Sequence, residues 1–339
     1  SDLIDVFQVK PELTYRFHNT LLQEVVYASL LTTDRERLHW AVGAAMERLY
    51  ADMLEEIAPQ LAHHFSVAGD NSRALKYFSI AGDAALNACA NEEAESRYRR
   101  ALELAPTQSE QGYGVSAGDL IYKLGQALYW QSRFLDAIQV WNEGIDLFQA
   151  LGDSDGVARL YARSARAVWD AGDTPGGLRL CRKGVAATAG AAESEGLALL
   201  LHEAGRAHLF NGQAAEARQL CQQALEMAER LGEITVQSEA LATLGLLPDQ
   251  PPEEALALLS KAAELAESAG LLSQAARAHV NLAALLATSA PDFGAARDHY
   301  RRAAELHRLR GNTAGEMLGL GGMAVVMLDS GRFEEVEAT

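Results

Sequence analysis

Small and large apolar residues recur along the chain with two spacings, one of four residues and one of about forty. A small residue is followed four positions later by a larger one, and this pair returns after 20, 43, 40, 40, 38 and 41 residues. The pairs are Ala74 and Phe78, Ala94 and Tyr98, Ala137 and Trp141, Gly177 and Cys181, Ala217 and Cys221, Ala255 and Leu259, and Ala296 and Tyr300, with Val336 opening the last unit 40 residues on. Residues four apart share one face of a helix. A period of this size indicates a solenoid, in which each unit buries its apolar face against its neighbours.

Each unit carries further small residues at fixed positions. Twelve residues before the pair stand Ala62, Gly125, Ala165 and Gly205, and five residues before it stand Gly69, Gly172, Gly212 and Gly331. This pattern resembles the tetratricopeptide repeat, a pair of antiparallel helices whose small residues let the two backbones approach closely. The resemblance covers residues 58–339 and implies an all-α, right-handed superhelical solenoid of about 15 helices.

Two details of the repeats carry separate predictions. The period exceeds the usual ~34 residues, so longer helices are expected, with units ending at Gly152, Gly232 and Gly311, where glycine suits a left-handed helix terminus. The single 20-residue step, from Ala74 to Ala94, predicts that one helix around residues 72–90 belongs to two successive units.

Residues 1–57 differ from the repeats. Apolar residues at helical spacing over 21–31 and 38–49 predict a helical cap. The run Tyr15-Arg16-Phe17-His18-Asn19-Thr20-Leu21-Leu22-Gln23-Glu24-Val25-Val26-Tyr27 is followed by Arg35-Glu36-Arg37-Leu38-His39. It resembles the linker between the ATPase module and the repeats of bacterial STAND-type signalling ATPases, which include transcription activators and class III adenylate cyclases. The resemblance implies a fragment whose catalytic domain lies upstream and whose last repeat is truncated.

Composition narrows the class of protein. Only 8 prolines occur among 339 residues, and no alternating run of β-branched residues predicts a strand. No stretch approaches the ~20 apolar residues of a membrane span, and the N-terminus lacks a basic-then-apolar signal. The 3 cysteines do not suggest a disulfide framework. Cys181 and Cys221 occupy the bulky second-helix position, so both are expected to be buried, in a protein of the reducing cytoplasm.

The net charge of −17 argues against nucleic-acid binding through a broad surface. The sequence has no phosphate-binding loop, and the glycines at 319–322 lack the dinucleotide-binding spacing. His202 and His208 stand six apart instead of four, so they do not share a helix face, and the adjacent His63 and His64 point in different directions. No catalytic residue, metal site or cofactor is predicted in this chain.

The first helix of each unit lines the concave face of such a solenoid, and arginines and aromatic residues gather there in three consecutive units. The expected ligand-contacting residues are Tyr122, Gln126, Tyr129, Trp130, Arg159, Arg163, Arg166, Trp169, His202, Arg206 and Phe210. The planar guanidinium of arginine can donate two parallel hydrogen bonds to a carboxylate or a phosphate. Aromatic rings supply rigid contact area. Arg159, Arg166 and Arg206 are expected to stay partly unpaired, although pairing with neighbouring acids is the open alternative.

These observations favour a non-catalytic module that binds a protein, a peptide with an acidic group or a small effector, as the sensor segment of a larger signalling ATPase. A structural oligomerisation arm, or part of an ATPase or cyclase whose catalytic domain lies elsewhere, remains an alternative. Self-association is expected through an apolar C-terminal face that includes Met323, Met327 and Leu328.

Overall fold

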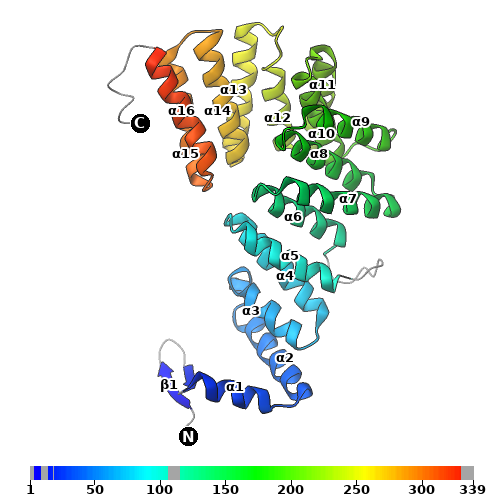
Figure 1. Cartoon of the computed structure of the whole chain (residues 1–339), viewed down its shortest axis with the longest axis vertical. Helices are drawn as coiled ribbons and strands as arrows, with labels where there is room; N and C mark the ends of the chain where they lie inside the picture. The colour runs from blue at the N-terminus through cyan, green and yellow to red at the C-terminus, as the bar shows by residue number, and fades with distance from the viewer. Residues whose placement is uncertain (1–3, 9–13, 18, 106–114, 330–339) are drawn as a thin grey trace. The chain divides into compact units, whose positions relative to one another are not determined.

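The computed structural model describes residues 4–8, 14–17, 19–105 and 115–329. By its contacts the chain divides into two compact units, Ser1–Leu120 and Ile121–Thr339. The described residues form sixteen α-helices, one short 3₁₀ helix and one β-hairpin, and Figure 1 shows the helices following one another along the chain. The boundary expected at residue 57 falls inside a helix, Leu54–Val67, so the helical packing is continuous there.

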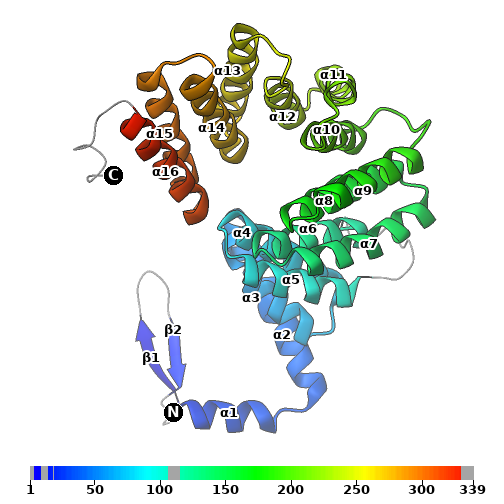
Figure 2. The same cartoon turned by 45° about the horizontal axis from the view of Figure 1, so that its top comes forward.

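The first unit begins with the strands β1 (Ile4–Gln8) and β2 (Thr14–Phe17), which pair antiparallel with Ile4 opposite Phe17 (Figure 2). Its helices are α1 (Thr20–Ser29), α2 (Thr32–Leu49), α3 (Leu54–Val67), α4 (Asn71–Asn87) and α5 (Asn91–Leu104), with the 3₁₀ helix η1 at Ala51–Met53. Helices α2 to α5 pack each against the next.

The hairpin corrects the expectation that no strand is present, whereas α1 and α2 confirm the helical cap expected over 21–31 and 38–49. Residues 14–17 of the run resembling a STAND linker form β2, and α1 begins only at Thr20. Two strands of four and five residues are too short for a periodicity to reveal them. Asn19 ends the extended segment, because its side chain accepts a hydrogen bond from the Leu21 amide at 2.8 Å and caps α1.

Two residues of that same run, Tyr27 on α1 and His39 on α2, lie in a chain of contacts that ends at His64 on α3. The Tyr27 hydroxyl lies 3.0 Å from His39 Nε2, and His39 Nδ1 lies 3.0 Å from His64 Nδ1. The His63 ring also lies against His39, with their centroids 5.6 Å apart. Partial burial and the neighbouring imidazoles lower the pKa values of His39 and His64.

The second unit is a succession of helix pairs. Its first helices are α6 (Ala117–Trp130, from residue 121 on), α8 (Ser154–Asp170), α10 (Glu195–Phe210), α12 (Ile234–Leu244), α14 (Leu272–Thr288) and α16 (Thr313–Asp329). Its second helices are α7 (Phe134–Leu151), α9 (Thr174–Ala187), α11 (Ala214–Leu231), α13 (Pro252–Ser268) and α15 (Phe293–Leu309). Each helix from α7 on packs against the next, and α8, α10, α12 and α14 also contact one another in that order. The first helices α8, α10, α12 and α14 therefore form one layer.

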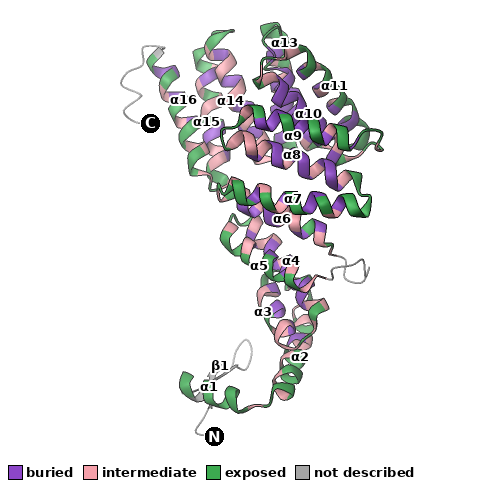
Figure 3. Cartoon of the chain, turned by 45° about the vertical axis from the view of Figure 1, so that its right-hand side comes forward, coloured by how far each residue is buried: buried purple, intermediate pink, exposed green. Residues whose placement is uncertain are grey.

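Burial follows this layering, and Figure 3 shows many buried positions on α8 and α10. Nine of the seventeen residues of α8, and twelve of the sixteen of α10, are buried. The expected helix ends are confirmed at Gly152 and Gly232, which adopt left-handed φ values of 69° and 75°. The helix α4 packs against both α3 and α5, as expected for a helix shared by two units. Gly331 and Val336 lie outside the described residues, as does the end of the truncated repeat.

Glycine at the close-approach position is explained by the bulky residue of the paired helix. A Cβ added to Gly125 would lie 2.0 Å from Nε1 of Trp141, and one added to Gly205 would lie 2.5 Å from Sγ of Cys221. Trp141 itself is fixed, because its Nε1 donates to the Tyr122 carbonyl at 3.1 Å. Cys181 and Cys221 are 0% and 1% exposed, which confirms their expected burial.

We expect Gly125→Ala to lower the free energy of unfolding by about 1 kcal/mol. Overpacking costs roughly 1–3 kcal/mol, and the better helix propensity of alanine offsets about 1 kcal/mol of that loss. Gly321→Ala is the matched control, since it adds a Cβ on α16 that meets nothing within 4 Å. Urea unfolding should show opposite signs for the two variants. Equal effects would contradict the close-approach explanation.

The C-terminal apolar face has different members from those expected. Met323 and Met327 are 7% and 6% exposed and belong to the packed side of α16. Leu328 is exposed as expected, and three further residues of α16 join it: Met317, Leu318 and Val325. The helix α16 packs against α15, with Gly319 and Gly322 of α16 facing Ala304 and Tyr300 of α15. Across the described ranges, none of the helices combines the length and the apolar character that a bilayer crossing needs.

Candidate functional site

The expected ligand-contacting residues lie together on the layer of first helices. Those on α6, α8 and α10 recur about one repeat apart, so they stand beside one another on successive helices. The Arg159 guanidinium lies 5.6 Å from the Tyr122 ring centroid. The Arg206 guanidinium lies 4.4 Å from the Trp169 ring centroid and 5.5 Å from that of Phe210. The sequence pattern therefore located a real cluster of arginines and aromatic rings.

Trp130 and Phe210 are the exposed rings of this cluster. They are 45% and 49% exposed, respectively. Each is held by neighbours, because the Trp130 ring lies 5.1 Å from Tyr129 and 4.8 Å from the Arg310 guanidinium, and Phe210 lies 5.2 Å from Trp169. Rings that are fixed on one side and open to solvent on the other are suited to contacting a partner.

The arginines are paired with carboxylates, which contradicts the expectation that they stay partly unpaired. Arg159 donates to Asp155 at 2.6 Å, and Arg166 donates to Asp170 at 3.1 Å. Arg206 donates from Nε to both carboxylate oxygens of Glu203, at 3.0 and 2.9 Å.

The partner acids stand three or four residues away on the same helix, a spacing at which side chains meet. The pairing could therefore have been predicted from the sequence, because Asp155, Asp170 and Glu203 stand three or four residues from the arginines they contact.

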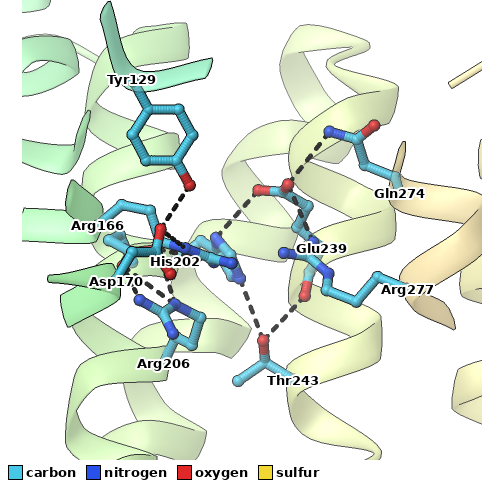
Figure 4. A network of polar contacts seen from close by, with 10 residues as sticks. Tyr129, Arg166, Asp170, His202, Arg206, Glu239, Thr243, Gln274 and Arg277 are labelled. Carbon is cyan, nitrogen blue, oxygen red and sulfur yellow. Dashed lines mark hydrogen bonds and ion pairs between the residues drawn. The ribbon is translucent and has the colours of Figure 1, made fainter. Parts of the chain in front are cut away.

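The pairs continue into a polar network that crosses five first helices (Figure 4). We define the polar network as Tyr129, Arg166, Asp170, His202, Glu203, Arg206, Glu239, Thr243, Gln274 and Arg277. Tyr129 on α6 donates to Asp170 on α8, and His202 on α10 lies 3.1 Å from Thr243 on α12. Both contacts join residues 41 positions apart, one repeat plus one residue. Sequence reasoning missed the α12 and α14 members. The same offset leads from His202 to Thr243, but not to Glu239, Gln274 or Arg277.

Glu239 is the centre of the network on α12. It accepts from Arg277 at 3.0 Å and from Gln274 at 3.3 Å, and its Oε2 lies 3.4 Å from His202 Nδ1. Burial alone would raise the pKa of Glu239, but Arg277 and the other nearby cations hold it below its usual range. The carboxylate is therefore ionised at neutral pH, and its charge is shared among several partners.

His202 is neutral at physiological pH. Its side chain is 1% exposed, and burial lowers its pKa to about 4 although Glu239 and Glu203 act in the opposite direction. Glu203 has a lowered pKa, because Arg206 outweighs the effect of its burial. The site thus holds ionised arginines and carboxylates beside an uncharged imidazole.

Arg163 differs from the other arginines of α8 and α10. Among the described residues it has no carboxylate within 4.0 Å, and its Nε is buried without a hydrogen-bond partner. Burial lowers the pKa of Arg163, but the net shift is upward because Tyr122, Glu239 and Glu203 lie nearby and Tyr122 is hydrogen-bonded to it. Arg163 is therefore a cation placed beside the polar network and bonded to a phenol.

The chemistry of this face is that of recognition. Its groups are ion-paired arginines and carboxylates, a neutral histidine and aromatic rings, without a nucleophile and base arranged for catalysis. Over the described part of the chain, no three histidine, cysteine or acidic side chains are grouped so that they could hold a metal ion.

Comparisons with known proteins establish the fold. Residues 189–335, less than half of the chain, match the family model described as soluble NSF attachment protein, SNAP. A comparison with curated protein sequences finds no match. Two similar solved structures are the Rap protein complexed with competence and sporulation factor and the apo form of the quorum sensor NprR from B. thuringiensis. The Rap protein is 11% identical with a TM-score of 0.57, over 86% of this chain and 80% of that one. NprR is 15% identical with a TM-score of 0.60, over 94% and 90%.

A third similar structure bears on the STAND resemblance. It is a STAND protein with a tetratricopeptide repeat sensor from Pyrococcus horikoshii, 15% identical with a TM-score of 0.51. The match covers 98% of this chain and 55% of that protein. The chain therefore has the fold of a tetratricopeptide-type solenoid, and this fold occurs in a STAND protein as predicted.

Proposed function

We propose that this chain is a non-catalytic sensor module that binds a peptide or protein segment against the first helices α6 to α14. The observation that carries this proposal is the exposure of Trp130 and Phe210 beside Tyr129 and Arg206 of the polar network. Aromatic rings and arginines contribute most to binding at protein interfaces, and here both are held in place by their neighbours.

The similar structures support the choice of ligand class. Two of them are a Rap protein complexed with competence and sporulation factor and a quorum sensor, and a third carries its repeats as a sensor. At 11% to 15% identity they supply the fold, so the peptide ligand is carried to this chain as a proposal. Within a larger signalling ATPase of the cytoplasm, the module would report ligand occupancy to the catalytic part.

The experiment uses the chain of residues 1–339 immobilised on a surface. A pool of synthetic peptides with seven randomised positions is passed over it, and the retained peptides are identified by mass spectrometry. We expect retention by the wild-type chain and at least about tenfold less by the double variant Trp130→Ala and Phe210→Ala, because each lost anchor costs on the order of 1 kcal/mol or more.

Phe293→Ala is the matched control, since Phe293 is a 37% exposed ring on the second helix α15. That variant should retain the same peptides as the wild-type chain. Failure of the wild-type chain to retain any peptide, or equal retention by the double variant, would contradict the proposal.

Self-association is the second candidate, and the exposed residues of α16 favour it. Met317, Leu318 and Val325 are 67%, 61% and 57% exposed, and a cluster of this kind is a common interface for another protein surface. Light scattering across a range of protein concentrations tests it. A mass that rises with concentration and returns to the monomer value in Leu318→Glu would support association through α16.

A further inference from the structure

Among the described residues, Arg163 is the one arginine of α8 and α10 without a carboxylate within 4.0 Å. The arginines of the polar network, Arg166, Arg206 and Arg277, are matched by three carboxylates, those of Asp170, Glu203 and Glu239. Arg163 lies beside Glu203 and Glu239 and adds a fourth positive charge. Arg159, one turn earlier on α8, forms ion pairs with Asp155 at 2.6 Å and with Glu195 at 3.7 Å. These five arginines are matched in number by five carboxylates, but in the part of the chain that the structure describes none of the five carboxylates lies within 4.0 Å of Arg163.

The acids near Arg163 are already engaged. Glu203 uses both oxygens for Arg206, and Glu239 accepts from Arg277 and Gln274. Neither comes within 4.0 Å of Arg163. A buried donor without an acceptor costs free energy, and a buried cation without a counter-ion costs more. A buried polar group without a partner requires an explanation, and an external group that completes its hydrogen bonds provides one.

The donor geometry of Arg163 identifies the group. A guanidinium offers parallel N–H donors that match the two oxygens of a carboxylate. Tyr122 is held against the guanidinium, because its hydroxyl also accepts from Gln126 at 3.1 Å and its ring lies under Arg159. The Arg163 guanidinium carries a single positive charge, which a monoanionic carboxylate balances and a phosphate dianion would exceed.

We propose that Arg163 receives a carboxylate of the bound segment, either an Asp or Glu side chain or the C-terminal carboxylate. This inference rests on the proposed function, and it makes Arg163 the residue that selects an acidic ligand. The exposed rings of Trp130 and Phe210 then contact the remainder of the segment and contribute affinity without regard to its charge.

The test uses three synthetic heptapeptide pools passed over the immobilised chain of residues 1–339. The first pool contains no Asp or Glu and ends in an amide, the second differs only in its free C-terminal carboxylate, and the third contains Asp and Glu but ends in an amide. Enrichment from the second pool identifies a terminal carboxylate, and enrichment from the third identifies a side-chain carboxylate. A fourth pool with phosphoserine and an amide end serves as the competing anion.

The variants are Arg163→Gln, which removes the charge, and Arg163→Lys, which keeps the charge but loses the fork. We expect Arg163→Gln to bind the enriched peptides at least about tenfold more weakly than the wild-type chain. The affinity of Arg163→Lys should lie between those of the wild type and Arg163→Gln. Both should unfold at a midpoint equal to or above that of the wild-type chain, because the replaced guanidinium has no internal counter-ion.

The outcomes separate this inference from the proposed function. Three outcomes would overturn the carboxylate assignment while leaving peptide binding in place. They are equal retention of peptides from the first pool, preferential retention of phosphopeptides, and enrichment that Arg163→Gln does not reduce. An unfolding midpoint of Arg163→Gln well below that of the wild type would also overturn it, since Arg163 would then be an internally satisfied structural residue. No retention from any pool would overturn the proposed function, and the inference with it.

Discussion

Replacing Glu203 by glutamine is expected to lower the free energy of unfolding by about 3–5 kcal/mol, because the change leaves a buried arginine without its counter-ion. Glu203 and Arg206 are both 5% exposed, and the guanidinium contacts both carboxylate oxygens. Glutamine keeps the size of the side chain but removes the charge that balances Arg206. Urea unfolding followed by circular dichroism measures the loss.

The control replaces both partners. The double variant Glu203→Leu and Arg206→Met removes both charges while roughly keeping the volume, and such replacements are often neutral or stabilising. We therefore expect the double variant to be close to the wild type and clearly more stable than Glu203→Gln. A double variant as unstable as Glu203→Gln would mean that the loss does not come from leaving Arg206 without its counter-ion.

Acidification is expected to destabilise the protein through His202, by about 2 kcal/mol between about pH 7.5 and about pH 5. Burial lowers the pKa of the folded imidazole to about 4, whereas the unfolded residue has its ordinary pKa of ~6.5. Above that ordinary value both states are neutral and the stability is complete. As the pH falls from about 6.5 towards 4, only the unfolded state takes the proton, so stability is lost.

The groups around His202 support this sign. Glu239 and Glu203 raise its pKa, whereas Arg277 and Arg206 lower it together with the dominant effect of burial. His202→Gln should flatten the dependence of the unfolding free energy on pH over this range. His307→Gln is the comparison variant: His307 is only half-buried and the lowering of its pKa is smaller than that of His202, so this change should flatten the dependence less. An unchanged slope in His202→Gln would show that another group accounts for the acid sensitivity.

The repeat architecture was available from the sequence because its signal is local. A small residue at Gly125 and a bulky one at Trp141 are each required by a contact within one helix pair, so their spacing recurs in every unit and can be read without a structure. The left-handed glycines at 152 and 232 follow equally from the local geometry of a helix end. The β-hairpin was missed because four or five residues per strand leave no period to detect.

The candidate site was predicted in its location but not in its electrostatics. The recurrence of arginine and aromatic residues placed Arg166, Trp169 and Arg206 together, and the structure brings them into contact. The pairing of Arg166 with Asp170 was also visible as a four-residue spacing, although its strength depends on burial. Whether a neighbouring acid pairs with an arginine or leaves the arginine available to a ligand depends on the distances between side chains of adjacent helices.

Only the tertiary structure decided how the charges are distributed across repeats. Glu239 and Arg277 join the network because α10, α12 and α14 pack side by side, which brings residues about 40 positions apart within hydrogen-bond distance. The same packing pairs Glu203 with Arg206 and Glu239 with Gln274, and among the described residues it leaves Arg163 hydrogen-bonded to Tyr122 without a carboxylate in contact. Local spacing therefore determined the helices and their faces. Burial and the competition for shared partners, which depend on several helices at once, determined the chemistry of the site.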